Sequence, residues 1–162
     1  MATNVTLSVQ TTLRILEMPL GKQPTISFHF EVSCVLKDRK KLKAFIVKTF
    51  KHEKRQLESL TYIFCSDKAL LAINQSYLRH DYYTDIITFD LSNKGSGLVG
   101  EVYISAERVK ENAEIHKVSF KNELHRVIFH GALHLCGYKD KTKSDKIRMR
   151  TAEDQLLSAY FN

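Results

Sequence analysis

The segment between Ser119 and Gly137 constrains the fold more than any other part of the chain. Its apolar residues recur at helical spacing, so we expect one long helix that begins near Ser119 and stops at Gly137, because glycine readily adopts the conformation that ends a helix. A stripe of aliphatic side chains marks its buried face: Val127, Ile128, Leu133 and Leu135. A helix this apolar must be covered, so we expect it to pack centrally against one face of a sheet.

Four other segments have the alternation or the β-forming composition of strands, and they lie at 26–33, 60–66, 85–91 and 98–105. Further helices are expected at 38–54, 67–78, 106–115 and 144–160, with Asp38 capping the first and Ser66 or Asp67 the second. Helices and strands alternate early in the chain and helices dominate late. We therefore predict an α+β protein with one mixed sheet of about four strands and helices packed on it.

Length and composition limit the possibilities further. The 162 residues fit one domain, which we assign to 25–162, while 1–24 is expected to be a poorly ordered N-terminal extension in which Met18 is an alternative start. That extension lacks a secretory signal, although its scarcity of acidic residues leaves a transit peptide as an alternative. No apolar run approaches the roughly 20 residues that span a bilayer. We expect no membrane association.

Cysteine usage and charge point to a compartment and a class of partner. The three cysteines are widely spaced and odd in number, which favours free thiols in a reducing compartment and hence a cytoplasmic protein. The net charge of +7 and the pI near 9.3 favour polyanionic partners such as RNA, without specifying one.

The chemistry concentrates at the end of the long helix. His130 and His134 are four residues apart, which places them about 40° apart around a helix and one turn above the other. Such a pair can bind one divalent ion, and Asp140, just beyond Gly137, can present a third ligand. Two histidines, one carboxylate and an open position suit a metal ion that activates water. The same spacing also occurs by chance in helices that bind no metal.

Gly131 argues against one class of metal enzyme. Zinc proteases with the motif HExxH use its glutamate as the general base, and Gly131 holds that position here, so a protease is not favoured. We expect Gly131 instead to remove side-chain bulk beside the metal site.

The segment FHGALHLCGYKD resembles the signature HGxLHLxGYDH of the YbeY family, metal-dependent endoribonucleases of bacterial ribosomal RNA maturation. The matching residues are His130, Gly131, Leu133, His134, Leu135, Gly137 and Tyr138. Residues 74–89 resemble the family's NxxYRxKDxPTDVLSF, and 99–105 resemble LGDIVIS. Glu123, Met149 and Glu153 also stand where the family commonly has the same residues.

Two departures from this pattern matter for the site, and Lys139 also stands where the family has aspartate. Asp140 replaces the family's third metal-binding histidine, so the zinc that the resemblance implies could give way to iron, manganese or nickel, which accept a harder oxygen ligand. The family's catalytic arginine directly follows its tyrosine. Leu78 occupies that place here, and we predict that the next residue, Arg79, substitutes for it, with His80 as the rival.

The resemblance implies a single-strand-specific endoribonuclease that matures the 3′ end of 16S rRNA and serves ribosome quality control, with ribosomal RNA and the small ribosomal subunit as partners. His130 and Arg79 would be catalytic, and one divalent ion would bind to His130, His134 and Asp140. Further RNA contacts are predicted for aromatic residues that could stack on bases and for basic residues that could guide the backbone: His80, Tyr82, Tyr83, Lys121 and Arg126.

Two other functions stay open. The first is a non-catalytic, ribosome-associated module with a structural metal, although structural zinc usually has four protein ligands and only three are evident. The second is a metal-dependent hydrolase of another substrate class.

Overall fold

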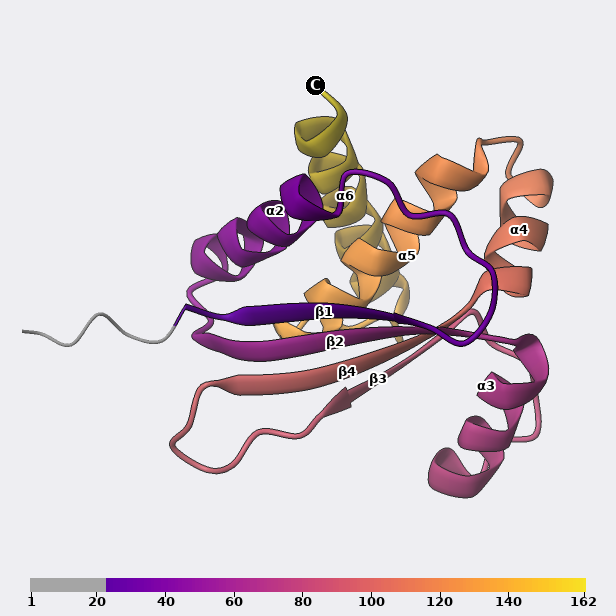
Figure 1. Cartoon of the computed structure of the whole chain (residues 1–162), viewed down its shortest axis with the longest axis horizontal. Coiled ribbons are helices and arrows are strands. Elements are labelled where there is room, and N and C mark those ends of the chain that lie inside the picture. The colour runs from indigo at the N-terminus through magenta and orange to yellow at the C-terminus, as the bar shows by residue number, and fades with distance from the viewer. Residues whose placement is uncertain (1–22) are drawn as a thin grey trace, which may run out of the picture.

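The computed structural model describes residues 23–162, which are built around a four-stranded sheet (Figure 1). Its strands are β1 (Thr25–Phe30), β2 (Leu57–Cys65), β3 (Ile86–Asp90) and β4 (Leu98–Ser105). They lie in the order β1-β2-β4-β3, with β1, β2 and β4 parallel and β3 antiparallel to β4 at one edge. The predicted α+β fold with one mixed sheet is confirmed. The predicted extension, 1–24, falls almost entirely outside the described residues.

The helices are α2 (Arg39–His52), α3 (Asp67–Ile73), α4 (Ala106–Ile115), α5 (Phe120–Leu135) and α6 (Lys143–Phe161), and a π-helical turn, η1 (Asn74–Leu78), continues α3. In Figure 1, α2, α5 and α6 lie over one face of the sheet, and α3 lies below the other face. No helix in the described part of the chain is long and apolar enough to cross a membrane. All three cysteines are free thiols.

Ser66 caps α3 as predicted, and Ser119 caps α5 in the same way. Ser66 Oγ accepts a hydrogen bond from the amide of Ala69, and Ser119 Oγ accepts one from the amide of Asn122. The prediction that Asp38 caps α2 with its side chain was wrong. Asp38 has a left-handed backbone (φ 52°), not the extended conformation from which a side chain reaches the first amides of a helix, and its carboxylate makes no cap hydrogen bond.

Helix α5 forms the centre of the structure, and its predicted apolar stripe is buried, with no member more than 5% exposed. Two glycines bring this helix close to the sheet. A Cβ atom on Gly131 would lie 2.8 Å from Val102 Cγ1 and 2.9 Å from Ile86 Cδ1, and one on Gly100 would lie 2.7 Å from Leu135 Cδ1. The bulk that Gly131 removes is therefore missing against β3 and β4, and not beside the metal ligands as we had expected.

Candidate metal centre

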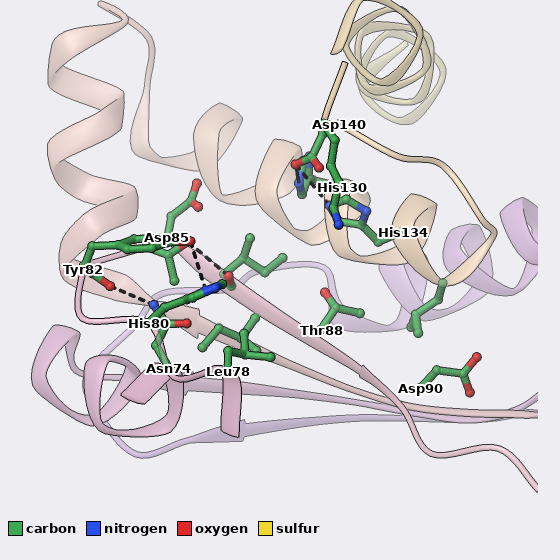
Figure 2. Close-up of a pocket in the computed structure, with 15 residues that line it drawn as sticks. Asn74, Leu78, His80, Tyr82, Asp85, Thr88, Asp90, His130, His134 and Asp140 are labelled. Atoms are coloured by element: carbon green, nitrogen blue, oxygen red, sulfur yellow. Dashed lines mark hydrogen bonds and ion pairs between the residues drawn. The ribbon is translucent and has the colours of Figure 1, made fainter. Parts of the chain in front are cut away.

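His130 and His134 lie on one face of α5, one turn apart, and Asp140 faces both of them (Figure 2). The two imidazole rings are perpendicular, with centroids 4.4 Å apart. Asp140 Oδ2 lies 3.8 Å from His130 Nε2 and 3.5 Å from His134 Nε2. Three ligands about 2.1 Å from one tetrahedral ion would lie roughly 3.4 Å from one another. The triad therefore fits a divalent metal ion.

The end of α5 explains how Asp140 reaches this position. Gly137 adopts a positive φ of 101°, and its amide donates to the carbonyl of His134 while the amide of Tyr138 donates to the carbonyl of Leu133. This is the glycine-terminated helix end that the sequence predicted, and it turns the chain back over the last turn of α5. The following residues then bring the Asp140 carboxylate over the two histidines.

The second nitrogen of each imidazole is already occupied. His134 Nδ1 donates to the carbonyl of Tyr138 (3.0 Å), and His130 Nδ1 contacts Glu153 Oε1 at 2.6 Å. A carbonyl only accepts, and an ionised carboxylate does the same, so each Nδ1 carries a proton; in the neutral imidazole that binds a metal, Nε2 is then the nitrogen with the lone pair. Together with the Asp140 carboxylate the two Nε2 atoms form three acceptors that converge without a donor between them, which is an arrangement that a cation satisfies.

Behind His130 lies a buried group of charges. Glu123 and Glu153 are almost fully buried, and the Arg126 guanidinium bonds to both of them, reaching Glu153 Oε2 at 3.2 Å. Burial by itself raises the pKa of Glu153, but the hydrogen bond and charge of His130, helped by Arg126, bring that pKa below its ordinary value. Burial, followed by the charge of His130, lowers the pKa of His134. The lowered pKa keeps the Glu153 carboxylate ionised, so that it can accept from His130. The lowered pKa of His134 keeps its imidazole neutral, as metal binding requires.

The triad borders a cavity of about 530 Å³, which we call the cleft. Its walls are η1 and the loop after it, β3, the end of α5, and the residue pair Asp140 and Lys141. The Asp140 side chain is 46% exposed, so the metal position opens onto the cleft and is not enclosed. An open position next to three ligands is typical of catalytic metal sites, whereas structural sites are closed by a fourth ligand.

The two rivals for the catalytic cation lie in different places. His80 lines the cleft, and its Nδ1 lies 3.1 Å from the hydroxyl of Tyr82, whose ring stacks on the imidazole with centroids 5.1 Å apart (Figure 2). Arg79 does not line the cleft, although Leu78 does. The π turn ends at Arg79 in a left-handed conformation (φ 56°), which changes the direction of the chain between neighbouring side chains. Position and direction therefore favour His80.

Three other predicted RNA contacts lie outside the cleft. Tyr83 packs beneath the Arg108 guanidinium (4.9 Å from the ring centroid), and Lys121 Nζ lies 5.0 Å from the centroid of Phe161. The guanidinium of Arg126 is held by two buried carboxylates, so it has no free charge to offer a phosphate. We do not retain Arg126 as an RNA contact.

Sequence reasoning missed the role of Glu153 beside His130 and the contribution of β3 to the cleft. The first carried a usable signal, since Glu123 and Arg126 stand three residues apart within the otherwise apolar face of α5 and needed a buried partner. The contribution of β3 to the cleft depends on the order of the strands, which no local sequence pattern indicates.

Replacement of Glu153 by glutamine is expected to weaken metal binding by about 10–100-fold, because a neutral amide no longer orients and polarises the His130 imidazole. The dissociation constant would be measured by competition with a chromophoric chelator. Asp154→Asn is the matched control, since Asp154 is the next residue and its carboxylate is 63% exposed. Equal affinities in Glu153→Gln and the unmodified protein would contradict this role.

Comparison with known proteins agrees with these features. The model of the family described as endoribonuclease YbeY matches residues 22–161. Proteins named endoribonuclease YbeY from Cytophaga hutchinsonii and Flavobacterium psychrophilum are 47% and 44% identical, over 85% and 83% of this chain and 96% of each relative. A solution structure of a Thermotoga maritima protein matches with a TM-score of 0.52 and 26% identity, covering 85% of this chain and 91% of that one.

Proposed function

Because the chain belongs to the endoribonuclease YbeY family, we propose that it cleaves single-stranded ribosomal RNA with one divalent metal ion held by His130, His134 and Asp140. The family assignment makes the protein a hydrolase that acts on RNA in ribosomal RNA processing. The observation that supports the proposal most is the convergence of three acceptor atoms in the wall of the cleft. We place the reaction in the cytoplasm, at the maturing 3′ end of 16S rRNA on the small ribosomal subunit and in ribosome quality control.

Each ligand contributes differently to the centre. A bound divalent ion would supply Lewis-acid chemistry, polarising a phosphoryl oxygen and activating water for attack. Glu153 and the carbonyl of Tyr138 hold the two imidazoles so that their Nε2 atoms face the cleft. Zinc remains our first choice, while the oxygen of Asp140 makes iron, manganese or nickel acceptable alternatives.

His80 is the residue that we propose for stabilising the charge on phosphorus. It lies across the cleft from the triad, where a protonated imidazole can donate to the phosphoryl oxygens as they gain negative charge (Figure 2). The exposed ring of Tyr82, stacked on the imidazole, adds a flat surface on which an unpaired base can lie. Tyr83 and Lys121 could still contact RNA beyond the cleft.

We expect His80→Ala to reduce cleavage of unstructured RNA by about 10²-fold, the usual effect of losing one donor to a transition state. Arg79→Ala, one residue away and outside the cleft, should change the rate by less than about threefold. Single-turnover kinetics would measure both, and metal content should stay unchanged because neither residue is a ligand. The reverse order of effects would restore the role first predicted for Arg79.

The proposed function is tested by removing the metal. Protein purified without metal-affinity steps and treated with a chelator should lose cleavage of unstructured RNA, and one equivalent of a suitable divalent ion should restore it. A duplex of the same sequence should resist cleavage under both conditions. Full activity in the chelated protein would overturn the role of the metal, and no cleavage under any metal would favour the non-catalytic module.

A further inference from the structure

The outer edge of β3 faces the cleft and carries unpaired main-chain groups. The amide of Leu91 donates to the carbonyl of Val99, and the amide of Ser105 donates to that of Asp85. Hydrogen-bonded and non-bonded pairs alternate along an antiparallel ladder, so the main-chain groups of Ile86, Thr88 and Asp90 point away from β4. Because β3 is the last strand of the sheet, no further strand covers them within residues 23–162, and only the carbonyl of Ile86 has a partner there, the hydroxyl of Thr84.

This edge is a wall of the cleft and not a remote surface. Ile86, Thr88 and Asp90 line the cleft together with the metal histidines (Figure 2). Ile87 lines it too, although its side chain packs in a separate cluster with Cys65 and Leu70, so the main chain of β3 forms part of the wall. Within the described residues, the N–H and C=O of Thr88 have no hydrogen-bond partner.

The surrounding charges determine which part of an RNA strand suits this edge. Asp85 and Asp90 stand at its two ends, and the hydrogen bonds from Ser92 lower the pKa of Asp90. Two carboxylates beside the edge repel phosphates, so the backbone of a bound strand is better placed toward His80 and Lys141 on the other walls. A nucleobase is uncharged, and its Watson–Crick edge carries donors and acceptors that can pair with N–H and C=O groups.

We propose that the β3 edge, at Thr88 and Asp90, pairs with the bases of unpaired RNA and so selects single strands for the metal centre. The Watson–Crick edges of a duplex are already occupied, so only an unpaired base can form these bonds. This inference rests on the proposed function, because it concerns how the RNA strand that is to be cleaved is held beside the metal centre. On this proposal β3 selects the substrate, whereas the metal ligands and His80 act in cleavage.

The test removes one outward amide. Thr88→Pro deletes the N–H of Thr88 without breaking a bond to β4, and proline is tolerated on an edge strand when its missing N–H would face outward. Thr88→Val keeps the amide and lacks the hydroxyl, so the additional loss in Thr88→Pro isolates the amide. Binding of a short oligouridylate, in chelator to prevent cleavage, should weaken about tenfold in Thr88→Pro relative to Thr88→Val. Binding of an abasic ribose-phosphate oligomer of the same length should be equal in the two variants.

Two results would overturn the inference: equal affinity of the folded variants for oligouridylate, or an equal loss with the abasic oligomer. Amide exchange in the unmodified protein gives an answer even if Thr88→Pro fails to fold. Oligouridylate should slow exchange at Thr88 and Asp90 by about tenfold or more, while Ile87 and Phe89, already bonded to β4, should change little. Unchanged exchange at Thr88 and Asp90 counts against the proposal.

The same measurements distinguish a failure of this inference from a failure of the proposed function. If the metal-loaded protein cleaves oligouridylate and Thr88→Pro binds it normally, only the role of the β3 edge fails. If the metal-loaded protein neither binds nor cleaves RNA, the proposed function fails with it.

Discussion

His130→Ala is expected to lower cleavage of unstructured RNA by about 10³-fold or more and to reduce the bound metal to a small fraction of one ion per chain. The substitution removes one of the three proposed metal ligands and also leaves Glu153 without its imidazole partner. A loss of several kcal/mol of transition-state stabilisation corresponds to a rate change of this size. Cleavage would be followed on a labelled oligonucleotide, and metal content by elemental analysis of the same preparation.

His52→Ala is the control for this experiment, because the His52 side chain is 85% exposed and lies in the last turn of α2. It should retain both activity and metal. Full activity of His130→Ala in metal-free buffer would exclude the metal centre described here as the site of cleavage.

Arg126→Met is expected to destabilise the protein by about 3–5 kcal/mol, because it leaves the buried carboxylates of Glu123 and Glu153 without their shared cation. Methionine retains much of the side-chain volume, so the effect reports the lost charge more than a cavity. In a domain of this size the melting temperature should fall by roughly 10 °C or more. Thermal and urea unfolding, followed by circular dichroism, would measure both quantities.

Arg150→Met offers a matched comparison. Arg150 also approaches Glu153, at 3.5 Å, but its side chain is 55% exposed, and ion pairs in solvent contribute at most about 1 kcal/mol. If the two variants lose similar stability, the burial of the Arg126 group is not what makes it important.

Much of the fold could be predicted because its signals are local. Each strand and helix carries its own periodicity, and Ser66 and Ser119 cap their helices through contacts three residues away. The triad could be assembled for the same reason, since a helical spacing of four and a glycine turn place all three ligands within eleven residues.

The parts that could not be predicted depend on contacts between distant segments. Glu153 lies 23 residues beyond His130 on another helix, and although Glu123 and Arg126 indicate that a buried partner is needed, no local pattern identifies it as Glu153. The order β1-β2-β4-β3, which places β3 at the edge beside the cleft, has no local signature. The direction of the Arg79 side chain could not be predicted for another reason: a π turn that ends in a left-handed residue changes side-chain directions in a way that helical periodicity does not anticipate.

Gly131 and Gly100 allow α5 to lie close to β3 and β4. At these positions α5 and the sheet are separated only by main chain and by the side chains of Val102, Ile86 and Leu135, with no intervening layer. The histidines stand on one of these two surfaces, and β3 belongs to the other. A shift of α5 at the two glycines would therefore move the histidines relative to β3. A methyl group at either glycine would collide with Leu135 or with Val102 and Ile86, so these side chains or the helix itself would have to move.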